Sequence, residues 1–367
     1  MNITIVSLRG PTNSDLKGGA REYIKDLAKP WVQKGHKVTL ICASESNFDL
    51  PVEEVVDGIN VKRISSKGSK VGSIWKFYTK NYKKSTDLLV ENMVSFPVFS
   101  PLFSKKEKNI TIIHHLTGKE YFKSHNLPTA MLGYFFEEIA IPLFYKKRNI
   151  VTVSQLTKNE LKRLGIVESN IKIISPGIDN EYFVEGKKSM HPSILYIGRY
   201  DGKNGVKKLD HLVEAYSMLK GEIEELELII AGPTKYKDEL DTICRDDKIK
   251  YLGFISEEQK RELYQYAWIF SSPSTREGFG ITYIEANASG TPVVGYEIEG
   301  LDTVSVDSGI LVEPNNIEKL KDALKELILN TSLRNEMSQK ARINSEKYSK
   351  KKFIEKSLAL ISNHIGE

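Results

Sequence analysis

Short runs of apolar and β-branched residues recur along the chain, separated by segments in which apolar residues have helical spacing. In the first half such runs cover residues 3–7, 38–43, 111–114 and 151–154. In the second half they cover residues 194–197, 226–231, 249–252, 268–271, 293–296 and 310–312. Strands that alternate with helices predict α/β domains built on parallel, doubly wound sheets.

A polar stretch at residues 186–192 separates the two series and has the composition of a linker. We therefore expect a hinge there, with one domain over residues 1–185 and a second over residues 186–350. A last helix in residues 351–367 is expected to pack back on the first domain. Two domains also suit a chain of 367 residues, which exceeds the usual size of a single core.

The composition excludes several classes of protein. Hydrophobic residues make up 40% of the chain and charged residues 28%, which is typical of a globular protein. A net charge of +5 is too mild to indicate a nucleic-acid partner. Cys42 and Cys244 cannot form a disulfide framework, which favours a reducing, cytoplasmic location. The most membrane-like run, residues 131–145, contains Glu137 and Glu138 and is too short to span a bilayer, so no transmembrane helix is predicted.

The most specific segment runs from Ser272 to Val294 and reads as a strand end, a glycine loop, a helix and another strand. Gly278 and Gly280 flank Phe279 and allow the backbone to approach a ligand closely, and the following helix begins with free amides. Glu277 lies in the loop and Glu285 lies inside the helix, and carboxylates accept well from sugar hydroxyls. The segment therefore predicts a site for an anionic or polyhydroxy ligand.

This segment resembles glycosyltransferase family four, a group of retaining transferases with the GT-B fold, and the resemblance extends over nearly all of the chain. It implies two Rossmann-like domains that face each other across a cleft, with an acceptor-binding first domain and a nucleotide-sugar-binding second domain. By the same resemblance Glu277 contacts the transferred sugar and Glu285 the ribose. The amides of the loop, Gly278, Phe279, Gly280 and Ile281, then hold sugar and phosphate.

The implied activity moves a hexose-type sugar from a nucleotide diphosphate-sugar, UDP rather than GDP, to an acceptor hydroxyl with retention of configuration. The acceptor is expected to be lipid-linked or a precursor of a cell-surface glycan. Two alternatives stay open, a nucleotide-sugar 2-epimerase and a sugar-nucleotide-binding subunit without transfer activity. The three-glycine fingerprint of dinucleotide binding is missing, which argues against a dehydrogenase.

A second match to the family is Tyr196-Ile197-Gly198-Arg199, followed by lysines. A guanidinium and an ammonium can neutralise the charge that develops on a departing diphosphate, and Arg199 is the candidate for the first. The family's lysine aligns with Lys207 through the register of the next helix, or with Lys203 by distance from Arg199. We favour Lys207.

In the first domain, Gly18 and Gly19 follow the first strand, as in the family's glycine loop that faces the diphosphate. A plain strand-to-helix turn is the alternative. His114 and His115 end a later strand, where the family has a histidine near the transferred sugar or acceptor. Because neighbours on a strand point to opposite sides, only one of them is expected to face the cleft, and we favour His114.

The sequence has no Asp-x-Asp pair at a strand end and no cluster of residues at metal-ligand spacing. We therefore expect neither a metal nor another cofactor, which agrees with what the family resemblance implies.

A lysine-rich segment over residues 67–84 carries no acidic residue. On a helix its apolar residues would form a single stripe, made of Val71, Ile74, Trp75, Tyr78 and Tyr82. Its cationic residues are Lys67, Lys70, Lys76, Lys80, Lys83 and Lys84. This pattern indicates a helix that binds an anionic membrane surface, and would place the protein peripherally on the cytoplasmic face. Packing of the stripe on the domain core is the alternative.

Overall fold

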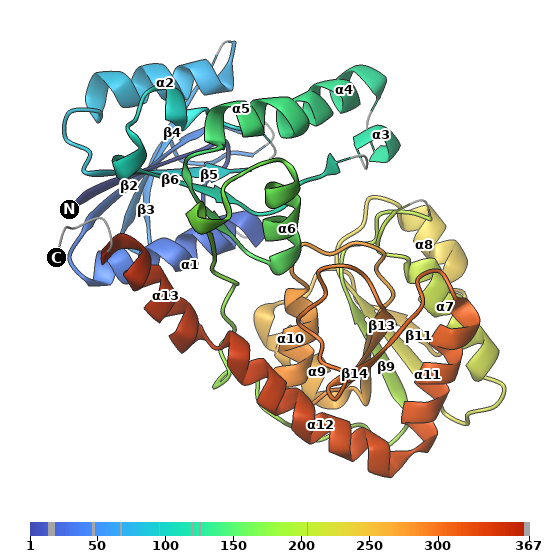
Figure 1. The fold of residues 1–367 in the computed structure, drawn as a ribbon. Helices are drawn as coiled ribbons and strands as arrows, with labels where there is room; N and C mark the ends of the chain where they lie inside the picture. The colour runs from blue at the N-terminus through green and yellow to red at the C-terminus, as the bar shows by residue number, and fades with distance from the viewer. Residues whose placement is uncertain are drawn as a thin grey trace. The chain divides into compact units, whose positions relative to one another are not determined.

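The computed structural model describes residues 1–13, 19–45, 48–66, 68–94, 96–118, 121–124, 126–203 and 205–362. The chain forms two compact units (Figure 1). The first contains Met1–Pro176 together with Phe353–Glu367, and the second contains Gly177–Lys352. The chain therefore passes from the first unit to the second earlier than the boundary at residue 185 that the sequence suggested.

The sheet of the first unit has eight strands within the described ranges, in the order β3-β4-β2-β1-β5-β6-β7-β8. All neighbouring strands are parallel except the edge pair β3 and β4. The strands are β1 (Asn2–Ser7), β2 (Lys37–Ala43), β3 (Glu53–Val56), β4 (Ile59–Ile64), β5 (Leu88–Met93), β6 (Asn109–Ile113), β7 (Asn149–Thr152) and β8 (Ile171–Ile173). The order reverses direction between β1 and β5, as in doubly wound folds.

Helices cover both faces of this sheet. In Figure 1, α1 and α13 lie below it and α2, α4 and α5 lie above it. The helices of the first unit are α1 (Gly19–Gln33), α2 (Lys70–Asn81), α3 (Tyr121–Ser124), α4 (Leu127–Phe135), α5 (Ile141–Tyr145) and α6 (Gln155–Arg163). Short 3-10 turns span Ser100–Leu102, Lys106–Lys108 and Glu168–Asn170.

The C-terminal helix α13 (Lys350–Ser362) belongs to the first unit from Phe353 onward. The indole of Trp31 in α1 donates a hydrogen bond to the carbonyl of Ser357, at 3.0 Å. The hydroxyl of Ser357 in turn donates to the carbonyl of Leu27, at 2.6 Å. Trp31, Leu27 and Ser357 are fully buried, so α13 is packed on α1 as part of the domain core.

The apolar stripe of α2 packs on the core of the first unit, which corrects the interpretation of this helix as a membrane-binding element. Ile74 and Tyr78 are buried against Val6, Ile41 and other core residues. The remaining members of the stripe, Val71, Trp75 and Tyr82, are partly buried against the same cluster. Lys67 lies outside the described residues. The stripe is therefore a core face.

The helix that follows β6 is longer than the sequence suggested. A continuous helical segment runs over Leu127–Tyr145 and comprises α4, a π-helical turn at Phe136–Ala140 and α5. By length and composition it could cross a membrane. However, Ile141 and Tyr145 belong to the core of the first unit, so the segment is part of a globular domain.

The second unit is built on an all-parallel sheet with the order β11-β10-β9-β12-β13-β14 among the described residues. Its strands are β9 (Ser193–Ile197), β10 (Glu227–Ala231), β11 (Ile249–Tyr251), β12 (Ile269–Ser272), β13 (Val293–Tyr296) and β14 (Gly309–Val312). Its helices are α7 (Leu209–Leu219), α8 (Lys237–Ile243), α9 (Glu257–Tyr266), α10 (Ile281–Ala288), α11 (Ile317–Leu329) and α12 (Thr331–Ser345), followed by a 3-10 turn at Glu346–Tyr348. Both units are thus Rossmann-like, as the sequence predicted.

The polar stretch at residues 186–192 packs within the second unit and does not join the two units. Lys188 is the clearest case, because its ammonium donates to the hydroxyl of Thr291 at 2.6 Å and to the carbonyl of Tyr264 at 3.3 Å. The amide of Ser189 also donates to the carbonyl of Tyr266, at 2.8 Å. These contacts hold the stretch against α9 and the α10–β13 turn, so it is no hinge.

Candidate functional site

The strand order of the second unit places its candidate site. The order reverses between the adjacent strands β9 and β12, and ligands of doubly wound sheets bind beyond the carboxyl ends of strands at such a point. Arg199 follows β9, and the loop with Glu277 follows β12. The two conspicuous sequence motifs of this unit therefore meet at the topological switch point.

The turn after β9 leaves little room for side chains. A Cβ atom on Gly232, which follows β10 and has a φ of +133°, would lie 2.1 Å from the carbonyl oxygen of Gly198. Only glycine fits this approach of two strand ends. The hydroxyl of buried Tyr196 donates to the carbonyl of Arg199, at 3.3 Å. The backbone that carries Arg199 is therefore fixed from both sides.

The side chain of Arg199 itself is exposed. In the part of the chain that the structure describes, its guanidinium has no ion-pair or hydrogen-bond partner. Without such a partner, the guanidinium keeps its N–H donors available to an anion.

The loop between β9 and α7 is attached to the loop after β12. The carboxylate of Asp201 accepts from the amides of Val206 and Lys207, at 3.0 and 3.3 Å. The carbonyl of Val206 then accepts from the amide of Thr275, at 2.8 Å. These bonds set Lys207 beside the strand-end loop of β12.

Lys207 and Glu277 form an ion pair with an Nζ–Oε1 distance of 2.6 Å. Their side chains are 23% and 12% exposed, so the pair is partly shielded from solvent. Lys203, the other candidate, lies in a different part of the loop, where its amide donates to Glu239 at 2.8 Å. Of the two lysines, the structure brings Lys207 next to a residue of the glycine loop.

The glycine loop leads directly into α10. Gly280 is the N-cap of this helix and has a φ of +77°, a conformation that favours glycine. Phe279 is buried and its ring packs edge-on against Tyr348 at 5.6 Å, while Gly278 is partly exposed. The first amides of α10, beginning at Ile281, have no partner inside the helix and carry its positive dipole end. This arrangement suits a phosphate or a sugar oxygen.

Glu285 differs sharply from Glu277 because it is buried on the inner face of α10. Its Oε1 accepts from Lys260 at 2.8 Å and its Oε2 accepts from the hydroxyl of Tyr264 at 3.1 Å. Burial raises the pKa of Glu285, and the ammonium of Lys260 opposes that shift. Each carboxylate oxygen keeps a second lone pair for a ligand hydroxyl.

Lys260 and Tyr264 are functional candidates that the sequence analysis did not identify. They are four residues apart in α9 and therefore lie on one face of that helix. The ammonium of Lys260 also lies over the ring of Phe183, 5.3 Å from its centroid. Their spacing of four residues in a polar helix was the only signal in the sequence that could have indicated them. It was insufficient because their partner, Glu285 in α10, is distant in the sequence.

In the first unit, His114 is tied into the domain and His115 is exposed. The Nε2 of His114 lies 2.7 Å from the Oδ1 of Asn92, whose amide group donates to Ser7 Oγ at 3.1 Å. Asn92 Oδ1 can only accept, so His114 donates through Nε2. The ring of Tyr23 packs edge-on against His114 at 5.1 Å.

Burial, with a smaller contribution from His115, lowers the pKa of His114 to about 3. His114 is therefore neutral at physiological pH and acts as a hydrogen-bond donor inside the domain. The expectation that His114 contacts the transferred sugar or acceptor stays a prediction.

The glycine loop of the first unit is described only in part. Gly19 is the first residue of α1 and is exposed, whereas Gly18 lies outside the described residues. Among the residues that the structure describes, no three histidines, cysteines or carboxylates gather where they could hold a metal ion. The donors around the candidate site are cationic side chains and backbone amides.

Comparisons with known proteins identify the family of the chain. The family model "Glycosyltransferase Family 4" matches residues 17–182, and "Glycosyl transferases group 1" matches residues 178–344. An uncharacterized glycosyltransferase from Methanocaldococcus jannaschii is 25% identical over 351 residues, which cover 87% of each chain.

Solved structures share the fold over the whole chain. A sucrose-phosphate synthase from Thermosynechococcus elongatus has a TM-score of 0.79 at 17% identity, covering 100% of this chain and 99% of that one. The Anabaena protein HepE, in a complex with UDP and glucose, has a TM-score of 0.73 at 17% identity, covering 98% and 99%. The protein thus has the GT-B fold and belongs to glycosyltransferase family 4.

Proposed function

We propose that this glycosyltransferase moves a hexose-type sugar from a UDP-sugar to an acceptor hydroxyl with retention of configuration and without a metal ion. The observation that carries the proposal is the ion pair of Lys207 with Glu277, at the switch point of the second unit. It brings together a cation for the diphosphate and a carboxylate for the sugar. Retention is supported by family membership, since family four is a group of retaining enzymes.

Each part of the donor has a partner of suitable chemistry. Glu285 would accept from the ribose hydroxyls, and the amides at the start of α10 would bind sugar or phosphate oxygens. Glu277 would accept from the hydroxyls of the transferred sugar. Lys207, which Glu277 balances in the structure, would gain the diphosphate as a second anionic partner.

In the proposed reaction the bond between the anomeric carbon and the β-phosphate oxygen breaks. The acceptor oxygen forms its new bond on the same face of the sugar, and a phosphate oxygen of the leaving diphosphate takes the hydroxyl proton. Arg199 and Lys207 stabilise the charge that develops on the leaving group. Two cations and a helix N-terminus supply the electrostatic role that a metal plays elsewhere.

The choice of UDP is supported by the solved structure of HepE, which holds UDP and glucose within the same fold. We also propose a lipid-linked acceptor or a precursor of a cell-surface glycan, with the enzyme peripheral on the cytoplasmic face of a membrane. The α2 helix does not supply the apolar face for such contact, because its stripe packs on the core.

Release of UDP from UDP-glucose and related donors, with and without a panel of acceptors, tests the proposal. We expect Arg199→Ala and Lys207→Ala to lower the release rate on the order of 10²-fold each, as for the loss of one oxyanion donor. Lys250→Ala is the matched control, because it breaks an ion pair of the same 2.6 Å length, with Glu227 at the edge strand β11. A chelator should leave the rate unchanged.

Several results would contradict the proposal. Unchanged release by both variants would place the cationic site elsewhere, and a chelator effect that magnesium reverses would show metal dependence. Conversion of the nucleotide-sugar to an isomer without release of UDP would indicate an epimerase. Binding of UDP without release from any donor would indicate a binding subunit.

A further inference from the structure

One face of the helical segment Leu127–Tyr145 is apolar and exposed. The exposed residues recur mainly at intervals of four, so they form a stripe along the segment. Each is between 49% and 70% exposed, and they are Leu127, Met131, Leu132, Phe135, Ile139 and Leu143. A contiguous exposed stripe of this length is uncommon on a monomer surface and marks an interaction site.

The opposite face explains why the stripe is directed outward. Ala130, Gly133, Ile141 and Tyr145 are buried in the first unit. The hydroxyl of Tyr145 donates to the buried carboxylate of Glu91, at 3.0 Å to each oxygen. These contacts fix the rotation of the segment about its axis, so it cannot turn its stripe into the core.

The acidic residues of the segment are removed from the stripe. Glu137 is buried, and its two oxygens accept from the amides of Thr117 and Gly118 at 2.8 and 2.6 Å. Glu138 forms an ion pair with Arg163 at 2.6 Å. The charges that interrupted this run in the sequence are therefore satisfied within the domain.

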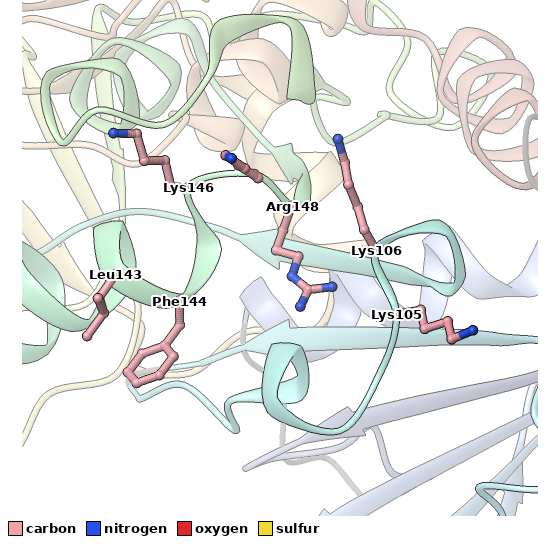
Figure 2. Close-up of a pocket in the computed structure, with 7 residues that line it drawn as sticks. Lys105, Lys106, Leu143, Phe144, Lys146 and Arg148 are labelled. Atoms are coloured by element: carbon pink, nitrogen blue, oxygen red, sulfur yellow. The ribbon is translucent and has the colours of Figure 1, made fainter.

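A cationic pocket of about 590 Å³ lies at the C-terminal end of the segment (Figure 2). Figure 2 shows that its side chains come from the end of α5 and from the loop before β6. The pocket is lined by Lys105, Lys106, Leu143, Phe144, Lys146, Lys147 and Arg148. Among the side chains that the structure describes, no carboxylate lines it, and Leu143 belongs to both pocket and stripe.

The pocket has a fixed frame. The guanidinium of Arg148 donates to the carbonyls of Pro101 and Ser104, at 2.8 and 3.2 Å, and so holds the loop before β6 against the end of α5. Lys146 and Lys147 are exposed beside it. Their ammonium groups are available to an anion from solution.

We propose that the stripe and the cationic pocket together form a surface that binds the face of a lipid bilayer with acidic headgroups. An apolar stripe enters the boundary between headgroups and acyl chains, and lysines at its end bind lipid phosphates. Charge complementarity selects this occupant, because a bilayer with acidic headgroups offers phosphates to the five cationic side chains of the pocket as well as an apolar region for the stripe. The surface is independent of the donor chemistry of the second unit.

Co-sedimentation of the full chain with vesicles tests this surface. The vesicles are pure phosphatidylcholine, or phosphatidylcholine and phosphatidylglycerol in equal parts. We expect binding to the acidic vesicles only, weakening as salt rises. Replacing Lys146 and Lys147 by glutamine should weaken binding on the order of thirty-fold. Replacing the exposed Lys76 and Lys80 of α2 by glutamine removes the same charge from outside the pocket and should leave binding unchanged.

Insertion of the stripe is tested by fluorescence. A Phe135→Trp variant should shift to the blue and be quenched by brominated acyl chains when acidic vesicles are added. Val55→Trp, at an exposed apolar position on β3, is the matched control and should do neither.

The proposal is overturned by binding that does not prefer acidic lipid, by equal losses in the two lysine variants, or by a Phe135→Trp signal that vesicles do not change. Sedimentation equilibrium tests the alternative that a second copy of the chain covers the stripe. A dimer that Phe135→Ser and Ile139→Ser convert to a monomer, with no vesicle binding by either form, would assign the stripe to self-association. UDP release in solution is measured on the same variants and should match the wild type, which separates this surface from the donor site.

Discussion

Two carboxylates of one motif have different surroundings in the second unit. Glu277 is partly shielded and paired with Lys207, whereas Glu285 is buried between Lys260 and Tyr264. The sequence motif located both carboxylates because they share one loop and one helix. It could not locate Lys260 and Tyr264, because pairing between α9 and α10 is a property of packing that no local pattern encodes.

At the same scale, His114 shows where strand alternation is an insufficient guide. The side chain leaves the end of β6 toward Asn92 and Tyr23 of the same unit. Alternation predicts that His114 and His115 point to opposite sides, and it does not say which side carries a ligand. The elements that contact His114, β5 through Asn92 and α1 through Tyr23, are separated from β6 in the sequence.

We expect His114 to stay neutral across the range from about pH 8 to about pH 5, in which unperturbed histidines titrate. Its folded-state pKa of about 3 results from burial first and from His115 second. The unfolded chain binds this proton and the folded chain does not. The contribution of His114 to stability is therefore lost as pH falls from about 6.5 toward 3.

Ring-proton NMR measures this titration, with His114→Gln as the variant that assigns the signal. A His114 signal that titrates with a midpoint near about 6.5 would contradict a neutral His114 that is hydrogen-bonded to Asn92.

At the scale of the element, strands with simple apolar runs could be predicted and strands with buried polar residues could not. Ten strands follow the runs identified in the sequence, including every strand of the second unit. β5 was missed because Glu91 and Asn92 interrupt its apolar run, although both are fully buried. β3, β4 and β8 were missed because they are short or rich in charged and polar residues. Their pairing is set by the sheet and not by their own periodicity.

Glu91 is expected to stabilise the first unit by holding the start of the 3-10 turn at Ser100–Leu102, which follows β5. Its carboxylate accepts from the amides of Phe99 and Ser100, at 3.2 and 2.9 Å, and from the hydroxyl of Tyr145. Glu91→Ala would leave these buried donors without an acceptor. We expect a loss of about 3 kcal/mol or more in the free energy of unfolding, measured by urea denaturation followed by circular dichroism.

The control for this prediction is Glu53→Ala, which removes an exposed carboxylate from an ion pair with Lys62 on the edge of the same sheet. It should lower stability by at most about 1 kcal/mol. Equal losses in the two variants would show that the network around Glu91 contributes no more than a surface ion pair.

At the scale of the whole molecule, the family and the two-domain GT-B fold were predictable, and the path of the chain between the units was not. The sequence marked residues 186–192 as a hinge because they are polar. In the structure Lys188 instead satisfies its ammonium inside the second unit, against Thr291 and Tyr264. A polar composition predicts that a segment is irregular. Whether the segment connects two domains or packs on one of them depends on its tertiary hydrogen bonds.

In the proposed donor site Glu285 and Glu277 have different roles. Burial and the contacts with Lys260 and Tyr264 hold the side chain of Glu285 in place, and we expect it to bind the ribose. Glu277, in the loop beside Lys207, is expected to act on the transferred sugar. Loss of Glu285 should therefore affect the nucleotide, and loss of Glu277 should affect transfer.

Calorimetry of UDP binding, combined with turnover of a UDP-sugar, directly tests whether Glu285 and Glu277 have these separate roles. Glu285→Ala should weaken UDP binding by about tenfold or more, in line with loss of a hydrogen bond to a charged group. Glu277→Ala should bind UDP nearly as the wild type does and lose turnover. Tyr264→Phe is the control: it keeps the aromatic ring and the Glu285 carboxylate and removes only the hydroxyl that donates to Glu285. It therefore separates the effect of losing the carboxylate from the effect of a change in packing. The reverse pattern, with UDP binding lost in Glu277→Ala and kept in Glu285→Ala, would contradict the assignment of the donor site.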